Sequence, residues 1–515
     1  MSEFLAQPPV PATIDLLVVG GGINGAGIAR DAAGRKLSVV LVEQDDLAAH
    51  TSSASTKLIH GGLRYLEQYR FKLVRKSLRE RAVLLRVAPH IIWPMRFVLP
   101  HDAHLHPAWF IRLGLFLYDH LAPRGALPAS RLIRLVRHPA GAPLQSSYRL
   151  AFEYSDAWVD DARLVVLNAV DAAERGAHVL TRTRCVSARR QPGGWQVVLE
   201  GVDGQQTTLT ARALVNATGP WAGQFLRHAV GSTDAPQTRL IRGSHIIVAR
   251  QFEHEFAYIF QTTDDRIVFA IPYEQDYTLI GTTEVDVGAE PVPAAISTAE
   301  VAYLCTLANR YFAKSLAPRD VLATYSGLRP LLANHTTDAS KVTRDYSLVV
   351  NAEGAPLLSV FSGKITTYRR LAEEAVDRLQ AALGTKIDGL GSGWTRDQPL
   401  PGGDMPQADF ARYSAAARQQ HGWLPEDLCL RYVRAYGTRV AVLLGDASSV
   451  EQLGAEVLPG LYEREIRYLL QHEFARSAAD ILWRRSKLGL PLGAEAAVLL
   501  EAWLREHTGG RPAPG

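Results

Sequence analysis

A glycine-rich turn near the N-terminus constrains this chain more than any other feature. Apolar Ile14 and residues 16–19 predict a short buried strand, and the turn after it carries Gly20, Gly22 and Gly25 in the spacing GxGxxG before a helical stretch. Gly20 permits the tight turn, Gly22 lets a pyrophosphate approach the backbone, and Gly25 lets the helix pack against the strand. The free backbone amides and the helix dipole at the start of this helix then favour a bound phosphate group. The segment predicts a dinucleotide site in an α/β fold.

A second predicted strand completes this unit. Residues 37–42, apolar except for Ser38, are followed by Glu43, whose carboxylate can accept hydrogen bonds from both hydroxyls of an adenosine ribose. Both NAD and FAD can be bound through this glycine turn and acidic residue. The next residues, DLAAHTSSASTKLIHGGLRYLEQY, form a polar loop of small hydroxyl residues and paired glycines, where a nicotinamide enzyme would usually continue its sheet. Such a loop favours a long buried flavin, so we expect FAD.

Several motifs further along the chain occur in a characteristic order. The blocks GGGINGAG, SSASTKLIHGGLRYLE, FEYSDAWVDDARL, LVNATGPWA, GSHIIV, TYSGLRPL and SGKITTYRRLAE run from Gly20 to Glu373, and in this the chain resembles the aerobic, FAD-dependent glycerol-3-phosphate dehydrogenase family. Two departures are Ser362, where the family is expected to have glycine, and a Pro-rich leader before the first strand. The resemblance implies an α/β protein with a Rossmann-like FAD-binding domain of the D-amino-acid-oxidase/glutathione-reductase type. An antiparallel-sheet substrate domain and an all-helical C-terminal cap would complete it.

The patterns along the chain divide it into discontinuous domains. We expect an FAD-binding domain in residues 1–68, 152–225 and 325–394, and a substrate and membrane-contact domain in residues 69–151 and 226–324. Residues 395–506 form the helical cap, and 507–515 a disordered tail. The residues expected to bind FAD are Gly20, Gly22, Asn24, Gly25, Glu43, Ser52, Ser53, His60, Gly61, Gly62, Val186, Thr218, Gly219, Gly363, Thr366 and Thr367.

Composition excludes several other classes of protein. The 515 residues are 47% hydrophobic and 21% charged, which suits a large globular core, and a net charge of +4 is too weak to indicate nucleic-acid binding. The three cysteines lie far apart, so neither a disulfide framework nor a zinc site is predicted, and a reducing cytoplasm fits best. No signal peptide and no spanning segment is expected, because no uncharged apolar run reaches the roughly 18 residues a membrane helix needs.

Three cationic residues near predicted strand ends are candidates for gripping a phosphate. Arg329, Arg344 and Lys364 lie in Gly- or turn-containing segments, and a guanidinium can hold phosphate oxygens bidentately. A pairing of each with a carboxylate such as Asp345 or Asp286 is the alternative. The resemblance assigns all three to phosphate or substrate contact and adds Arg64 and Tyr65 to the substrate site. Lys364 also precedes a helix whose start would favour negative charge on the flavin.

Oxidation of a secondary alcohol also needs a base for the hydroxyl proton. His245, in GSHIIV on a predicted strand, is the first candidate, because histidine titrates near neutrality and the resemblance places it at the substrate. A structural histidine is the alternative for this position. His60 in KLIHGGLRY competes for the role. We therefore expect His245, Arg329 and Lys364 to be the catalytic residues, without a metal.

A basic amphipathic segment predicts contact with a membrane surface. On a helix over about 69–87, an apolar stripe of Phe71, Val74, Leu78, Ala82 and Leu85 lies beside Lys72, Arg75, Lys76, Arg79 and Arg86. The apolar segment PAWFIRLGLFLYDHL, with Trp109, is suited to lying in an interface. For either segment alone, a core-facing helix with a solvated face is an equal alternative.

These features together predict an oxidoreductase that converts sn-glycerol 3-phosphate to dihydroxyacetone phosphate. Hydride passes to FAD, and the resemblance implies that the electrons go on to ubiquinone or another membrane quinone. The protein would lie peripherally on the cytoplasmic face of the inner membrane, and whether it forms a homodimer stays open. The alternatives are a glycerol-3-phosphate oxidase that uses oxygen and a non-catalytic flavin-binding membrane module.

Overall fold

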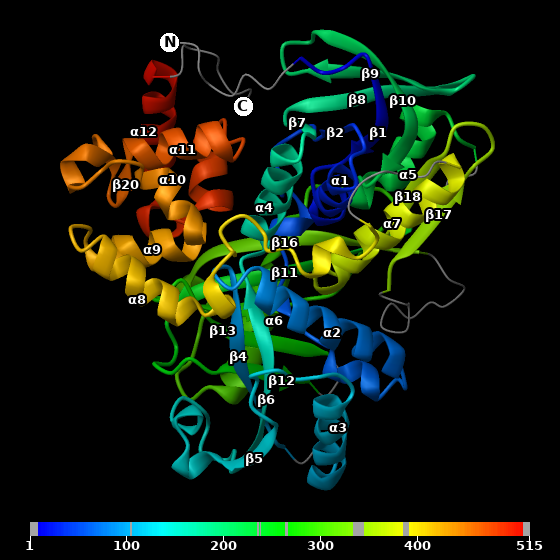
Figure 1. The fold of residues 1–515 in the computed structure, drawn as a ribbon. Helices are drawn as coiled ribbons and strands as arrows, with labels where there is room; N and C mark the ends of the chain where they lie inside the picture. Colours follow the sequence, from blue (N-terminus) through cyan, green and yellow to red (C-terminus); the bar gives the residue numbers. More distant parts are fainter. Residues whose placement is uncertain are drawn as a thin grey trace.

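A computed structural model describes residues 9–102, 106–233, 236, 238–262, 266–332, 345–384 and 391–507 of the chain. Figure 1 shows one large sheet in the upper part of the molecule, a second in the lower part, and a group of helices from the C-terminal residues beside them at the left. The predicted α/β fold with an FAD-type nucleotide domain, a second sheet and a helical C-terminal region is confirmed.

The first sheet is built around parallel strands. Its order is β17-β18-β10-β1-β2-β7, with β8 and β9 as a ribbon that pairs through β9 with β10. The strands β18, β10, β1, β2 and β7 run parallel. Their bounds are β1 (Thr13–Val19), β2 (Val39–Val42), β7 (His178–Leu180), β8 (Thr183–Gln191), β9 (Gly194–Gly201), β10 (Gln206–Asn216), β17 (Ser347–Asn351) and β18 (Leu357–Phe361).

Both faces of this sheet are covered, which explains why β1 and β2 are apolar on both sides. One face packs against α1 (Ile23–Gly34), α4 (Asp161–Glu174) and α7 (Tyr368–Leu383). The other face packs against the β8–β9 ribbon and α5 (Ala222–Phe225). Local signals start the helices: the side chain of Asp160 caps α4 by accepting a hydrogen bond from the amide of Arg163.

The second sheet is mostly antiparallel and has the order β15-β11-β14-β13-β12-β4-β6-β3, with β16 paired to β11 and β5 to β6. Helix α6 (Thr298–Tyr311) packs on one face, and α2 (Phe71–Val87) and α3 (Ala108–His120) pack on the other. The strands are β3 (Leu58–Ile59), β4 (Ile92–Pro100), β5 (Arg131–Arg134), β6 (Leu150–Val159), β11 (Thr238–Ala249), β12 (Ala257–Gln261), β13 (Ile267–Tyr273), β14 (Tyr277–Gly281), β15 (Val285–Gly288) and β16 (Val321–Leu332).

Strand membership differs from the expected division in two places. Residues 152–225 and 325–394 were expected with the nucleotide domain, but β6 pairs with β4 along its whole length and β16 pairs with β11. Both strands therefore belong to the second sheet. They return the chain toward the first sheet at their ends, because α4 follows β6 directly.

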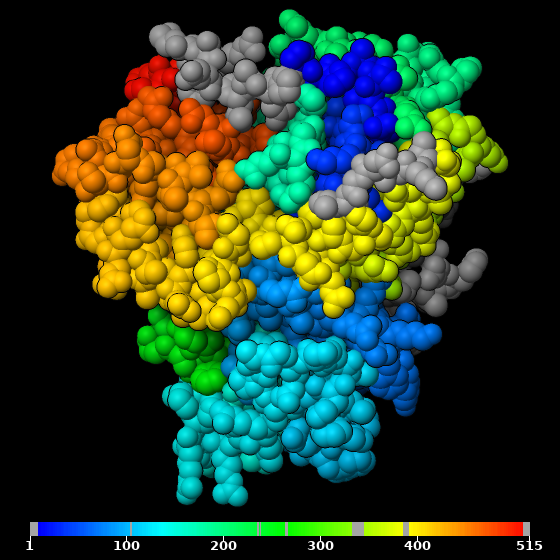
Figure 2. Space-filling model, in the orientation of Figure 1, coloured from blue at the N-terminus to red at the C-terminus, as the bar shows by residue number. Residues whose placement is uncertain are grey.

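The C-terminal region has a hydrophobic core of its own. It contains α8 (Phe410–Gln420), α9 (Glu426–Tyr436), α10 (Val440–Leu444), α11 (Glu463–His472) and α12 (Gly489–His507). It is not helical throughout, since β19 (Glu456–Leu458) and β20 (Leu461–Tyr462) form a small antiparallel hairpin. Figure 2 shows this region, in orange and red, packed against the rest of the molecule. The predicted disordered tail lies outside the described residues, apart from His507.

Candidate active site

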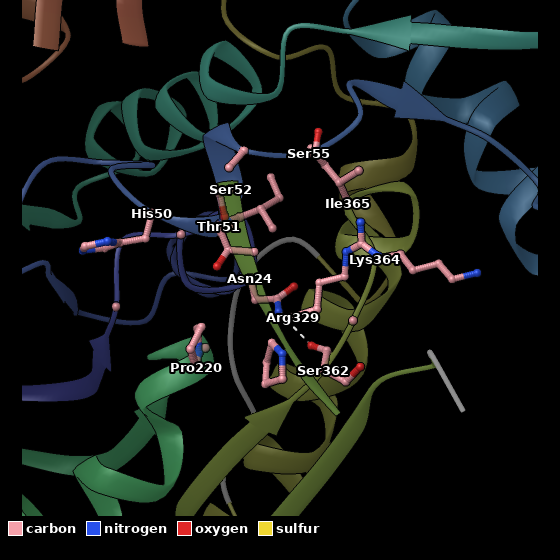
Figure 3. A pocket seen from close by; sticks show the side chains of 18 of the residues that line it. Asn24, His50, Thr51, Ser52, Ser55, Pro220, Arg329, Ser362, Lys364 and Ile365 are labelled. Carbon is pink, nitrogen blue, oxygen red and sulfur yellow. Dashed lines mark hydrogen bonds between the residues drawn. The ribbon is translucent and has the colours of Figure 1, made fainter. Parts of the chain in front are cut away.

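A cavity of about 500 Å³ lies between the two sheets. Its lining combines the glycine turn after β1, the loop that follows β2, the end of β10, strands of the second sheet and the turn before α7. Figure 3 shows side chains from these separate segments arranged around it. The cavity therefore connects the predicted nucleotide site with the predicted substrate sheet.

The glycine turn brings the start of α1 to this cavity. Gly20 has a φ of 111°, a conformation that favours glycine. A Cβ atom at Gly20 would lie 2.5 Å from the carbonyl oxygen of Ala217, and one at Gly25 would lie 1.9 Å from the carbonyl oxygen of Gly20. Gly22 is the N-cap of α1 and supplies no side-chain cap. The amide of Ile23 donates to Ser52 Oγ at 3.0 Å, and a helix start without a cap from its own N-cap residue, beside a glycine turn, suits a pyrophosphate.

A buried polar atom at the same place also fits a ligand. The Oδ1 atom of Asn24 is buried without a hydrogen-bond partner among the described residues, while its Nδ2 donates to the carbonyl oxygen of Ser362 at 3.4 Å (Figure 3). A buried acceptor left in this state normally meets a ligand or water donor. The residues present therefore fit a dinucleotide cofactor.

Glu43 lies at the end of β2 with its carboxylate at the cavity wall. Its Oε2 accepts a hydrogen bond from the amide of Gly21 at 2.7 Å, and its Oε1 accepts one from the amide of Asp45 at 2.9 Å. Burial raises the pKa of this carboxyl, although the two amides oppose the rise. Each oxygen keeps a second lone pair, so the carboxylate can still accept from a ribose.

The carboxylate has two titratable neighbours. His50 Nε2 lies 2.8 Å from Asp45 Oδ2, and this hydrogen bond lowers the pKa of Asp45 and raises that of His50. One atom each of Glu43, Asp45 and His50 fall within 4.8 Å of one another. We assign this group to the nucleotide end of the cavity, because Glu43 and His50 both line it.

The loop over residues 51–62 is fixed from both sides. The hydroxyl of Thr51 donates to the carbonyl oxygen of Leu328 at 2.8 Å. The hydroxyl of Tyr325 donates to the backbone carbonyl oxygen of Ser55 at 2.8 Å. At its far end the amide of Gly61 donates to the hydroxyl of Tyr118 at 2.8 Å, beside the buried pair of Arg81 and Asp156. These contacts hold the loop against β16 and α3.

The predicted cations Arg329 and Lys364 both line the cavity, as do Arg64 and Tyr65. Lys364 Nζ lies 3.8 Å from the ring centroid of Tyr65. Arg329 Nη2 donates to Thr282 Oγ1 at 3.2 Å, and Nη1 lies 3.4 Å from Glu284 Oε1. These four positive or polar side chains thus line one cavity, with Lys364 against Tyr65 and with Arg329 on β16 of the second sheet.

The carboxylates proposed as alternative partners lie elsewhere. Asp286 pairs with Arg239, and Asp345 lies 3.7 Å from Lys76. The carboxylate near Arg329 is instead Glu284, which the sequence analysis did not consider. Glu284 lies in GTTEV, three residues after the end of β14. Arg344 lies outside the described residues.

The two candidate bases occupy different positions. His60 lines the cavity, whereas His245 is fully buried and does not. His245 Nε2 lies 3.0 Å from the hydroxyl of Thr56, which does line the cavity, and the ring stacks on Tyr325 at 4.7 Å. Burial, together with the charges of Arg329 and Lys57, holds the pKa of His245 well below its usual value. His245 thus reaches the cavity only through Thr56.

Most of the residues expected at the cofactor line the cavity. Those that do are Gly20, Gly22, Asn24, Glu43, Ser52, His60, Gly62, Val186, Thr218, Gly219, Gly363 and Thr366. Those that do not are Gly25, Ser53, Gly61 and Thr367, which shape the surrounding backbone. Ser53, for example, donates its hydroxyl hydrogen to the carbonyl oxygen of His50.

The predicted membrane-contact helix α2 turns most of its apolar stripe inward. Val74 and Leu78 are buried against the second sheet, and Phe71 is the member of the stripe that is exposed, by 38%. The expectation that this stripe faces a membrane is therefore wrong for most of its length. The basic residues Lys72, Arg75 and Arg79 beside it are exposed.

Helix α3 carries the apolar surface instead. Trp109 is 69% exposed, Phe116 50% and Leu113 48%, and Phe110 and Leu117 are exposed beside them. A patch of large exposed apolar side chains commonly marks a binding surface. None of the described helices combines the length and the apolar character needed to cross a bilayer.

Comparisons with known proteins agree with this geometry. Residues 15–369 match the model of the FAD-dependent oxidoreductase family, and residues 394–505 match that of the C-terminal domain of alpha-glycerophosphate oxidase. A glycerol-3-phosphate dehydrogenase of Pseudomonas aeruginosa is 53% identical and covers 98% of this chain, with 97% of that protein aligned. An aerobic glycerol-3-phosphate dehydrogenase of Escherichia coli is 48% identical over 96% of this chain and 98% of that protein.

Two further similarities bear on substrate and fold. A D-erythritol 1-phosphate dehydrogenase of Brucella abortus is 50% identical over 95% of this chain and 98% of that protein. Among solved structures, a glycerol-3-phosphate dehydrogenase of Bacillus halodurans complexed with FAD has a TM-score of 0.77 and 26% identity, and covers 96% of this chain and 91% of that one. These relatives each cover at least 95% of this chain.

Proposed function

Because this chain belongs to the family of FAD-dependent oxidoreductases, we propose that it oxidises sn-glycerol 3-phosphate to dihydroxyacetone phosphate and passes the electrons to a membrane quinone. The observation that carries the proposal is that Arg329, Lys364 and Arg64 line the same cavity as the glycine turn. A phosphorylated substrate and a dinucleotide would then meet inside one enclosed space.

The cations set the orientation of the substrate. Arg329 offers a planar fork to two phosphate oxygens, and Lys364 and Arg64 add positive charge around the same group. The ion pair of Arg329 with Glu284 is 3.4 Å long and partly exposed, so a phosphate can compete for the guanidinium. Phosphate binding would fix the carbon chain relative to the flavin site and leave the hydroxyl groups to the remaining polar lining.

Bound FAD supplies the acceptor for the hydride that leaves the substrate carbon. The residues of the chain have to remove the hydroxyl proton. We assign this task to His245 acting through Thr56: the Thr56 hydroxyl takes the substrate proton as its own proton passes to His245 Nε2, 3.0 Å away. Burial, with the charges of Arg329 and Lys57, lowers the pKa of His245, so the ring is neutral before the step, although the same shift makes it a weaker base. His60, which lines the cavity, is the competing base.

Steady-state kinetics with a soluble dye acceptor test the substrate. We expect kcat/KM to be highest for sn-glycerol 3-phosphate and much lower for glycerol, which lacks the phosphate. The similarity to a D-erythritol 1-phosphate dehydrogenase favours that longer sugar-alcohol phosphate as the second candidate. If D-erythritol 1-phosphate gives the higher kcat/KM, the proposed substrate is wrong and the phosphate site stands.

Variants at the two histidines test the base. His245→Asn and Thr56→Val should both lower kcat with little change in KM, whereas His60→Asn should do less. Loss of kcat in His60→Asn with full activity in Thr56→Val would assign the proton to His60.

The exposed face of α3 supports peripheral contact with a membrane, where a quinone dissolves. Apolar burial would anchor the helix, and the neighbouring basic residues of α2 would attract an anionic surface by on the order of 1 kcal/mol each. Serine at Trp109 and Phe116 should reduce co-sedimentation with anionic vesicles and slow ubiquinone reduction, while reduction of a soluble dye stays normal.

A matched control is available in the C-terminal region. Val498 and Leu499 of α12 are 66% and 54% exposed, and serine at both should leave vesicle binding unchanged. Equal loss in both double variants, or no loss in either, contradicts the assignment to α3. Formation of hydrogen peroxide in proportion to turnover, with no gain from ubiquinone, would indicate the oxidase alternative.

A further inference from the structure

A buried network of ion pairs joins the C-terminal helical region to the segment that follows Glu43. Asp46 is 1% exposed, although it is charged and lies in a loop. Its Oδ1 accepts a hydrogen bond from Arg485 Nη2 at 2.9 Å, and its Oδ2 accepts one from Arg484 Nε at 2.5 Å. Both arginines belong to the helical turn between α11 and α12.

A second connection runs through Arg182, which lies just before β8. Its backbone amide donates to the carbonyl oxygen of Asp45 at 2.9 Å. Its guanidinium Nη2 donates to both carboxylate oxygens of Asp480, at 2.7 and 2.8 Å. Burial acts to raise the pKa of Asp480, but Arg485, Arg182 and Arg484 outweigh it and hold the pKa well below its usual value.

The helical region is itself fixed to the nucleotide domain behind this network. Arg163 of α4 pairs with the buried carboxylate of Glu473, with Nη2 at 2.8 Å from Oε1. Arg485 donates from Nη2 to the carbonyl oxygen of the same glutamate at 2.7 Å. Figure 1 shows α4 lying beside this group of helices. The contact with Glu473 therefore fixes Arg485 independently of its ion pair with Asp46.

The same short segment forms the cavity wall on its other side. Glu43, Gln44, Ala48, Ala49 and His50 all line the cavity, whereas Asp46 faces the C-terminal region. The segment over residues 43–50 is thus positioned between the adenosine end of the cofactor site and the ion network. A buried carboxylate that loses its partners is strongly unfavourable, so this segment cannot move independently of the arginines.

We propose that Arg484, Arg485 and Asp480 are positioning residues for FAD, which act through Asp46 and Arg182 to hold the segment over residues 43–50 in its cofactor-binding shape. The C-terminal helical region is then part of the cofactor-retaining machinery, although none of these three residues lines the cavity. Such coupling is reciprocal: a bound FAD must also stabilise the packing of the helical region.

The rate of FAD release from the holoprotein tests the first half of this proposal. Asp46→Asn keeps the shape of the side chain and removes its charge, and Arg484→Gln removes the positive charge that contacts both Asp46 and Asp480 at the rim of the network. After dilution into FAD-free buffer, flavin fluorescence should appear about tenfold faster in either variant, within the usual range for coupled sites. Arg484 is 16% exposed on its side chain, so its variant is expected to fold even where Asp46→Asn does not.

Glu465→Gln is the matched control. Its carboxylate is fully buried and paired to Arg431 at 2.6 Å inside the C-terminal region, with no contact to the segment after Glu43. This variant should lower the thermal midpoint while FAD release stays at the wild-type rate. Equal acceleration in Glu465→Gln and Arg484→Gln would mean that general loosening of the helical region, and not Asp46, controls release, and the proposal would fail.

Hydrogen exchange of the full chain tests the reciprocal half. Addition of FAD should slow amide exchange in residues 463–485 of the wild type, and this slowing should be lost or much reduced in Arg484→Gln. Unchanged exchange in that stretch when the wild type takes up FAD would overturn the proposal, whatever the release rates.

Discussion

Replacement of Arg329 by lysine tests the phosphate site most sharply. The guanidinium is held by Thr282 at 3.2 Å and by Glu284 at 3.4 Å, and its side chain is 32% exposed. A partly exposed ion pair contributes only about 0–1 kcal/mol, so exchanging Glu284 for a phosphate oxygen costs little. Gly243 leaves room for the fork, since a Cβ there would lie 2.7 Å from Arg329 Nη2.

Lysine keeps the charge in this space and loses one of two parallel hydrogen bonds. A charge-assisted hydrogen bond contributes about 1.5–3 kcal/mol. The KM for sn-glycerol 3-phosphate should therefore rise about 10- to 150-fold, while the slow reaction of glycerol changes little. Initial rates with a soluble dye acceptor measure both.

Arg239→Lys provides the control, because Arg239 lies on the neighbouring β11, pairs with Asp286 and does not line the cavity. It should leave both substrates unaffected. Equal losses on glycerol and on its phosphate in Arg329→Lys would refute the reasoning, since the residue would then act on something other than phosphate.

Three other substitutions have defined outcomes. Glu43→Ala should release FAD on dialysis and yield paler protein, because a charged acceptor of about 1.5–3 kcal/mol per hydrogen bond is lost; unchanged flavin content would contradict the role of Glu43. Ser362 has a φ of 64°, so Ser362→Gly should relieve backbone strain and raise the free energy of unfolding by up to about 1 kcal/mol, which raises the thermal midpoint. A lower thermal midpoint in this variant would argue against strain. Burial, with Arg163 and Arg434, lowers the pKa of His90 from 6.5 to about 3. Between these pH values only the unfolded chain takes up that proton, so the free energy of unfolding should fall as pH drops, by up to about 1.4 kcal/mol per pH unit. The fall should be less steep in His90→Gln. Identical pH slopes for the wild type and this variant, measured by chemical denaturation, would disprove the role of His90.

Local sequence signals predicted the nucleotide end of the site well. The spacing of Gly20 and Gly25 reflects close backbone contacts with Ala217 and Gly20 that exclude any side chain, a Cβ at Gly22 would lie 3.0 Å from Ser52 Oγ, and Glu43 directly follows its strand as expected. These features are recognisable because the glycine spacing and the strand that ends before Glu43 are each contained in one short stretch of sequence, even though Gly20 packs against the distant Ala217. Ser362 is instructive as well: its positive φ gives a physical reason for the glycine expected there.

Features that depend on distant segments were harder to predict. Residues 152–225 were expected in the nucleotide domain, but β6 pairs with β4 of the second sheet, a partner that no local pattern specifies. The stripe of α2 is amphipathic whether it meets lipid or protein, and Val74 and Leu78 meet protein. His245 lies behind Thr56 because of how β11 packs against the loop, and Asp46 meets arginines more than 400 positions away. No pattern within one short stretch of sequence predicts such long-range contacts.

Anaerobic titration of the purified holoprotein with sn-glycerol 3-phosphate tests the central claim most directly. We expect the flavin absorbance to bleach at an equimolar amount of substrate and dihydroxyacetone phosphate to appear in the same amount, with no bleaching by glycerol at that concentration. A flavin spectrum that sn-glycerol 3-phosphate leaves unchanged, in protein that dithionite still bleaches, would contradict the proposed reaction.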